Sequence, residues 1–189
     1  MLTPQIDIRE LPLTSTELAE GESSWFAIQT RPRYEKKVVS ELQEKDINVF
    51  LPLFSVKRQW SDRQRVVHPP LFPNYVFVRV LPTPSTRVSI LRTNGVTSFV
   101  GVRGVGTPIP DGEIKALRTV IEQKVAFEPY PYLKIGERVC IRGGCLHGIE
   151  GMLTAINGDQ SLVVSVDLIQ RSIAIRITGY RVEATKSAG

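Results

Sequence analysis

The fold of this 189-residue chain is decided by the stretch Leu-Phe-Pro-Asn-Tyr-Val-Phe-Val at residues 71–78. Pro73-Asn74 suits a tight turn, because proline pre-sets its φ angle and asparagine tolerates left-handed backbone. Residues 75–80 are aromatic or β-branched apart from one arginine and have the length of a single strand. The stretch therefore predicts a turn that leads directly into a strand. Its three aromatic rings are more typical of a core than of an interface.

Upstream of this stretch the pattern predicts a strand, a helix and an extended segment. Residues 25–28, Trp-Phe-Ala-Ile, form an apolar run of strand length. A helix is predicted over 32–45, with proline at its first position and one apolar stripe along its length. Residues 48–60 are rich in strand-forming types and lead to a turn at Ser61-Asp62.

Downstream, the pattern predicts a short helix over 86–92, a strand over 96–100 and a last helix capped by Asp111. In the last helix Ile114, Leu117 and Ile121 share one face. The resulting order of strands and helices predicts an antiparallel sheet with helices packed on it, which is an α+β domain.

The second half of the chain reads differently. Residues 126–133 contain two prolines and no helical or strand period, which predicts a linker. Three later segments, around 138–142, 162–168 and 173–177, alternate in the manner of strands and predict a small β-barrel. The predicted organisation is a flexible leader (1–21), an α+β domain (22–125), the linker (126–133) and the barrel (134–185).

Composition and charge limit the possible functions. No stretch approaches the roughly 20 apolar residues that cross a bilayer, and residues 1–21 lack the order of a secretory signal. Two cysteines make neither a disulfide framework nor a four-ligand zinc site, which favours a reducing, cytoplasmic setting. The chain has a formal net charge of +5, but the leader carries −3, so the remainder carries +8. A basic body is compatible with a nucleic-acid partner and equally with simple solubility.

The sequence offers no catalytic constellation. Its two histidines, His68 and His147, have no metal-ligand or triad-like spacing, and the glycine-rich segment 101–106 does not open a helix as a phosphate loop would. We therefore predict a non-enzymatic protein without cofactor or metal.

A basic hairpin is the clearest candidate for nucleic-acid contact. Residues 57–65 place four cations and one anion around a tryptophan. Such cations can contact phosphates and the indole can stack on a base, although a solvated hairpin is the plainer interpretation. The candidate contacts are Lys57, Arg58, Trp60, Arg63 and Arg65.

Taken together, these motifs resemble the NusG family of transcription factors. The N-terminal, or NGN, domain is matched by Trp25 to Ile28, the basic helix after it, residues 71–78, and Gly95 to Gly101. The KOW motif of the same family, which forms an SH3-like barrel, is matched by residues 136–139, Gly143-Gly144, Gly148 and Gly151. The stretch 71–78 is similar to the specialised paralogues, the RfaH and UpxY-like antiterminators.

The resemblance implies that an apolar patch docks on the clamp helices of RNA polymerase and disfavours the paused state. The positions that match the patch are Phe72, Phe77, Val102 and Ile114, whereas Gln29 stands where the paralogue has an aromatic residue. A second contact across the polymerase cleft matches Thr86 and Ser89. Upstream or non-template DNA would meet the basic hairpin.

The barrel of the family recruits a ribosomal protein or the termination factor Rho. The loop that carries this contact matches Leu146, His147 and Ile149, with leucine in place of phenylalanine at the first position. Packing of Leu146 inside the loop is an equally good interpretation.

The predicted function is thus a cytoplasmic, monomeric elongation or antitermination factor, associated with the nucleoid through polymerase and specialised for particular operons. The alternative is a stand-alone RNA-binding KOW protein that grips RNA through Arg138, Arg142, Arg171 and Arg176.

Overall fold

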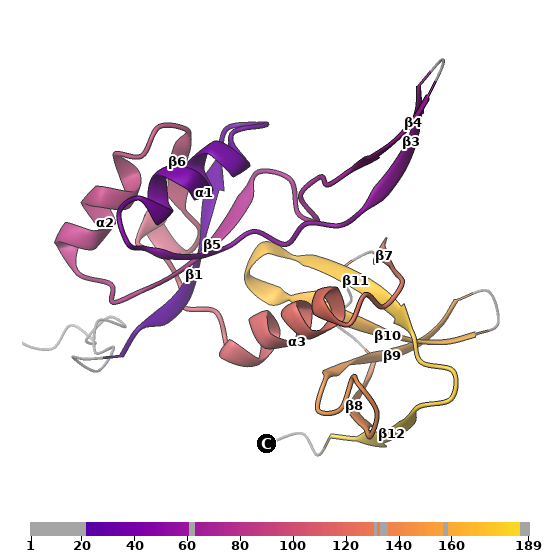
Figure 1. Ribbon diagram of the computed structural model, residues 1–189. Coiled ribbons are helices and arrows are strands. Elements are labelled where there is room, and N and C mark those ends of the chain that lie inside the picture. The colour runs from indigo at the N-terminus through magenta and orange to yellow at the C-terminus, as the bar shows by residue number, and fades with distance from the viewer. Residues whose placement is uncertain (1–21, 61–62, 131, 133–135, 157–158, 186–189) are drawn as a thin grey trace, which may run out of the picture.

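A computed structural model describes residues 22–60, 63–130, 132, 136–156 and 159–185. The predicted leader and the predicted turn at Ser61-Asp62 lie outside these residues. The chain forms an N-terminal α+β domain and a C-terminal β domain, with helix α3 between them (Figure 1). This confirms the predicted fold class.

The N-terminal domain is built on a four-stranded antiparallel sheet with the strand order β2-β5-β1-β6. A separate two-stranded hairpin, β3-β4, projects from the domain (Figure 1). The elements are β1 (Ser24–Thr30), α1 (Glu35–Gln43), β2 (Asn48–Phe50), β3 (Val56–Trp60), β4 (Arg63–Val67), β5 (Tyr75–Val80), α2 (Pro84–Leu91), β6 (Val96–Phe99), the 3-10 turn η1 (Val102–Gly104) and α3 (Asp111–Glu122).

The two faces of this sheet belong to different hydrophobic clusters. Alternate residues of a strand point to opposite faces, so Phe26 and Val76 join a cluster with Val38 and Leu42 of α1. The opposite face contributes Trp25, Ala27 and Phe77 to a second cluster, which also contains α3. Helices α1 and α2 therefore cover one face, and the other face is left for α3.

The predicted turn and strand at 71–78 are confirmed, and the turn is held by a buried glutamate. Asn74 adopts a positive φ of 69°, and its backbone N–H donates to Glu35 Oε1 at 2.9 Å. Helix α1 begins at Glu35 and not at Pro32 as predicted. The reason is Arg33, whose φ of 67° is incompatible with a right-handed helix. The shorter helix brings Glu35 to the turn.

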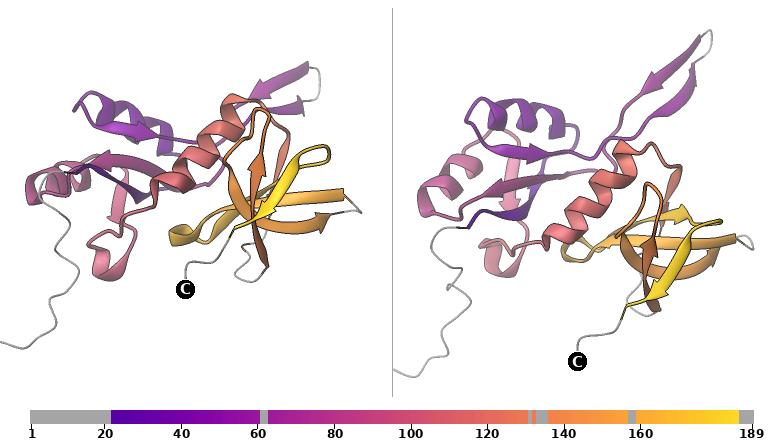
Figure 2. Two further views of the ribbon diagram at one scale, coloured as in Figure 1. Left: turned by 90° about the horizontal axis from the view of Figure 1, so that it is seen from below. Right: turned by 60° about the horizontal axis from the view of Figure 1, so that its bottom comes forward.

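The C-terminal domain is a six-stranded antiparallel sheet in the order β12-β8-β9-β10-β11-β7, which curls around its own core (Figure 2). Its strands are β7 (Phe127–Tyr130), β8 (Glu137–Arg142), β9 (Glu150–Ile156), β10 (Asp159–Val166), β11 (Arg171–Arg176) and β12 (Arg181–Ala184), with a 3-10 turn η2 (Asp167–Ile169) between β10 and β11. The three segments predicted as strands are β8, β10 and β11.

The stretch predicted to be a linker contains a strand of this sheet. Residues Phe127–Tyr130 form β7, which pairs antiparallel with β11. Pro129 is compatible with this position because β7 is the last strand in the sheet order, where one side needs no hydrogen-bonding partner. The connection between α3 and the C-terminal domain is therefore short.

Candidate functional site at the junction of the two domains

An aromatic cluster occupies the α3 side of the N-terminal sheet. The ring of Phe77 stacks on Phe50 with 6.0 Å between centroids, and it meets Phe72 edge-on at 6.4 Å. The guanidinium carbon of Arg118 on α3 lies 4.8 Å from the Phe50 centroid and 4.9 Å from that of Trp25. Cation–π attraction therefore adds to apolar burial in joining α3 to the sheet.

Three of the four predicted patch residues are buried in this arrangement. Phe72, Phe77 and Ile114 are 3%, 0% and 1% exposed. They belong to one hydrophobic cluster that also includes core residues of the C-terminal domain, such as Val166 and Ile169. The prediction of an open docking surface is wrong for these side chains, because α3 and the C-terminal domain both pack on the same apolar side.

Val102 is the patch residue that remains accessible. It lies in η1 and is 76% exposed, and Val105 beside it is also exposed. The η1 loop is attached to α2 by Arg87, which donates from Nη2 to the carbonyl oxygen of Gly104 at 3.0 Å and lies 4.9 Å from the Phe99 centroid. This attachment presents Val102 to solvent on an anchored loop.

Thr86 and Ser89, predicted to contact polymerase, both lie on α2 and take part in local hydrogen bonds. The N–H of Thr86 donates to Oγ1 of the N-cap Thr83 at 3.1 Å. The carbonyl oxygen of Ser89 accepts from Lys45 Nζ at 3.1 Å. These contacts give both positions a structural role, and their contact with polymerase stays a prediction.

The basic hairpin has the predicted strand pairing. β3 and β4 pair antiparallel from Val56–Val67 to Trp60–Arg63. The backbone thus places Lys57, Arg58, Trp60, Arg63 and Arg65 on one projecting arm (Figure 1). The side chain of Arg65 is exposed. Contact of this arm with DNA is not tested by the fold.

In the C-terminal domain only one of the three predicted partner contacts faces solvent. Leu146 and Ile149 are 0% and 3% exposed and belong to the core, which supports the packing interpretation of Leu146 and corrects the prediction for Ile149. His147 is exposed, and its Nδ1 accepts from the Gly143 N–H at 2.9 Å. Of these three residues only His147 is at the surface, and contact of this loop with a partner stays a prediction.

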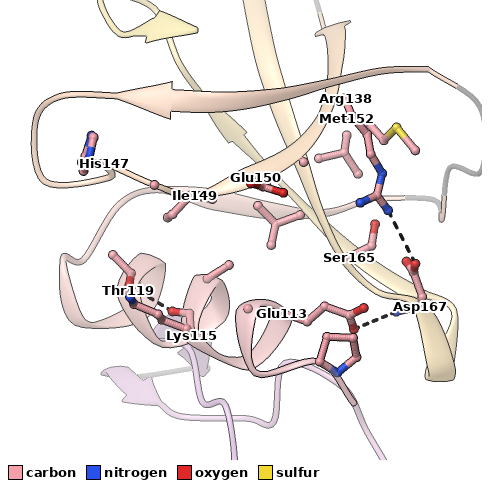
Figure 3. Close-up of a pocket in the computed structure, with 17 residues that line it drawn as sticks. Glu113, Lys115, Thr119, Arg138, His147, Ile149, Glu150, Met152, Ser165 and Asp167 are labelled. Atoms are coloured by element: carbon pink, nitrogen blue, oxygen red, sulfur yellow. Dashed lines mark hydrogen bonds and ion pairs between the residues drawn. The ribbon is translucent and has the colours of Figure 1, made fainter. Parts of the chain in front are cut away.

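A cleft of about 550 Å³ runs between α3 and the C-terminal domain (Figure 3). At one end the backbone N–H of Asp167 donates to Glu113 Oε2 at 3.2 Å, and Arg138 Nη2 lies 3.8 Å from Asp167 Oδ2. Burial, followed by the neighbouring Asp167 carboxylate, raises the pKa of Glu113 to about 7. Neither Glu113 nor Asp167 is among the site residues predicted from the sequence.

One signal in the sequence could have revealed the junction. Besides Ile114 and Leu117, α3 buries Ala116 and Val120, whereas the predicted Ile121 is only half-buried. Apolar positions that extend around a helix beyond a single stripe indicate burial against more than one neighbour. Here the neighbours are the N-terminal sheet and β10.

Comparison with models of protein families shows to which family the chain belongs. The family model described as "Transcription termination factor nusG" matches residues 23–118, about half of the chain. The chain belongs to the NusG family. Its matched region covers the N-terminal domain through most of α3. This confirms the resemblance predicted from the sequence motifs.

NusG proteins of several bacteria align along most of the chain. "Transcription termination/antitermination protein NusG" of Lactococcus lactis is 28% identical over 186 residues, covering 90% of this chain and 98% of that protein. The NusG of Borreliella burgdorferi is 26% identical over 180 residues, covering 85% and 97%. The chain is thus a NusG-type transcription termination/antitermination factor.

A solved structure supports the fold. The structure described as "Domain interaction in Thermotoga maritima NusG" matches with a TM-score of 0.52 and 19% identity, covering 87% of this chain and 98% of that one. Among the described residues, no helix is long and apolar enough to cross a membrane. Within the same residues, no group of three or more metal-ligating side chains is placed to hold an ion.

Most of the arginines on which the RNA-binding alternative depends form ion pairs with carboxylates of the same chain. Arg138 lies against Asp167 at 3.8 Å, Arg142 against Glu183 at 2.8 Å and Arg176 against Asp159 at 3.0 Å. A paired cation attracts phosphate less strongly, because the partner carboxylate cancels much of its field. This pairing disfavours the alternative.

Proposed function

We propose that this factor binds RNA polymerase through its N-terminal domain, on the clamp helices, and suppresses pausing or termination without chemical catalysis. It acts as a cytoplasmic monomer and is a specialised paralogue for particular operons. The β3-β4 hairpin contacts upstream or non-template DNA, and the C-terminal domain recruits a ribosomal protein or Rho, with His147 as the exposed contact.

The observation that supports this proposal is the apolar side of the N-terminal sheet and α3. Its residues share a single hydrophobic cluster with the C-terminal domain. A surface that is apolar enough to hold one partner by burial can also hold another of matching shape. Polymerase helices are the partner proposed here, and buried anchors at such an interface each contribute about 2 kcal/mol or more.

The burial of Phe72 and Phe77 adds a condition. Both rings are covered in the free chain, and α3 packs on the same side of the sheet as the C-terminal domain. These rings can therefore meet polymerase only after α3 and the C-terminal domain rearrange. Val102 needs no such movement, because it is exposed already. We therefore propose that the η1 loop makes the initial contact, and that fuller docking follows the uncovering of both rings.

The test uses the exposed residue, so that folding is not disturbed. Val102→Asp places a charge in the proposed interface and should weaken binding to core polymerase about tenfold, which corresponds to about 1.4 kcal/mol. Binding is measured by fluorescence anisotropy without nucleic acid, and pausing is measured on a transcription template. Val66→Asp is the matched control, since Val66 is 56% exposed and lies on the hairpin. Parental affinity of the Val102 variant would remove this loop from the interface, and no binding by the parent chain would refute the proposal.

A further inference from the structure

We propose that protonation of Glu113 is a latch between the two domains: the protonated side chain holds the C-terminal domain on α3, and the ionised side chain releases it. This inference concerns the free chain and goes beyond the proposed function. It would hold whether or not polymerase is the partner of the apolar side.

The geometry places Glu113 at the point where the domains meet. It lies in the first turn of α3, and its carboxyl Oε2 accepts the backbone N–H of Asp167 in η2 at 3.2 Å. Figure 3 shows the Glu113 side chain directed towards Asp167 at one end of the cleft. This is a hydrogen bond between the domains, and its acceptor can change charge.

The charges around Glu113 are unbalanced in the closed arrangement. From η2 comes the Asp167 carboxylate, and from β8 comes Arg138, which is already 3.8 Å from Asp167. Tyr132, in the segment before β8, also lies near these groups: burial, then the Asp167 carboxylate and to a smaller extent that of Glu113 raise its pKa. On α3 itself, Asp111 and Lys115 are exposed neighbours. One arginine therefore faces two carboxyl groups, and protonation of Glu113 removes the repulsion between them.

The pKa of Glu113 agrees with this geometry and gives the direction of the effect. Burial and the Asp167 charge raise the pKa of Glu113 from 4.5 to about 7 when the domains are together. In separated domains, where Asp167 is absent, an ordinary pKa near 4.5 is expected. Closure is then fully favoured below pH 4.5, weakens as the pH rises towards 7, and changes no further above it. The ratio of closed to open molecules falls by up to about tenfold per pH unit inside this window.

A histidine, His147, also lines the cleft. It lies away from Glu113, beside the Thr119 end of α3 (Figure 3). A His147→Gln variant therefore separates the two possible sources of pH dependence. The latch predicts that this variant keeps the parental pH profile.

The experiment uses the full chain labelled with ¹⁵N. Relaxation rates give one tumbling time for each domain. The two tumbling times are equal when the domains pack together and differ when the domains separate. The chain is measured between pH 5.5 and pH 8, and the Asp167 amide shift is followed as a direct reporter of Glu113. Glu113→Gln keeps a neutral hydrogen-bond acceptor and should remain closed over the whole range. Glu122→Gln is the matched control, because Glu122 is an exposed glutamate on the same helix and should behave as the parent.

The expected result for the parent is common tumbling at pH 5.5 and separate tumbling at pH 8. A second variant, Arg138→Gln, removes the cation that favours the ionised form of Glu113. The pKa of Glu113 in the closed arrangement should then rise further, and the pH-dependent loss of closure should extend to higher pH. Equal tumbling times of the parent at both pH values, or a Glu113→Gln variant with the parental pH profile, would overturn the latch. Loss of the pH profile in His147→Gln would likewise overturn it by assigning the effect to the histidine.

Discussion

At the scale of single residues, Gly95 adopts a backbone conformation that other residues rarely adopt. Its φ is +101°, and a Cβ added there would lie 2.5 Å from Cδ1 of Tyr34. Gly95→Ala should therefore lower the free energy of unfolding by about 1–3 kcal/mol, from backbone strain and from displacement of Tyr34. Gly112→Ala is the matched control, because this site has an ordinary φ and open space around it. The control should be neutral or stabilising by up to about 1 kcal/mol. The free energies of unfolding of the two variants are compared by urea unfolding, followed by tryptophan fluorescence. An equal effect of both substitutions would mean that strain and the Tyr34 contact at Gly95 are not the cause.

Residue types were predicted well, but their exposure was not. The aromatic and β-branched run at 75–80 correctly predicted the strand that carries Phe77, yet the sequence could not show what covers that ring. The same limit applies to Ile149, which was predicted to face a partner and lies in the core. For Leu146, which is also in the core, partner contact and loop packing were equally good interpretations of the sequence. Exposure depends on contacts between distant segments, and a local pattern contains no information on those contacts.

At the scale of elements, the segments with a strong period were predicted and the weak ones were missed. β5, α2 and the start of α3 lie within a few residues of their predicted positions, and β5 and α3 each contain apolar residues of one period. β7 was interpreted as linker because its two neighbouring prolines hide a strand that pairs only along one side. β9 and β12 were not predicted. Element α3 was predicted with one apolar stripe and proves to bury residues against two partners.

The double role of α3 leads to a prediction about stability. Leu117 is 0% exposed within the cluster that joins both domains. Leu117→Ala should cost about 2–5 kcal/mol, because it removes buried methyl groups and leaves a cavity. Glu122→Ala, at an exposed site on the same helix, should stay within about 0.5 kcal/mol of the parent. Thermal unfolding is followed by tryptophan fluorescence for the N-terminal domain and by amide signals for the C-terminal domain. Both transitions should move to lower temperature, and a shift of neither would mean that α3 is not a shared element.

At the scale of the whole molecule, the packing of the two domains decides which apolar side chains of the junction are exposed. Two domains were predicted, but the closed packing that buries Phe72, Phe77 and Ile114 was not. Contacts across a domain junction are formed by a few residues from each side, such as Phe54 and Phe127, whose ring centroids are 6.0 Å apart. No periodic pattern connects such residues, so the sequence gives no indication that they meet.

Under the proposed function, this packing makes polymerase binding depend on how often the apolar side is uncovered. Phe127→Ala removes an aromatic pair that contributes about 0.5–1.5 kcal/mol, which lowers the closed-to-open ratio by about two- to tenfold. Since apparent affinity scales with the fraction of binding-competent molecules, the variant should bind core polymerase more tightly, by up to about the same factor. Phe54→Ala removes the same pair from the other domain and should have the same effect, and the double variant should add little to either. Glu128→Ala, exposed on the same strand β7, should leave binding unchanged. Weaker binding by both phenylalanine variants, with both domains folded by circular dichroism, would mean that these rings contact polymerase directly and do not keep the domains together.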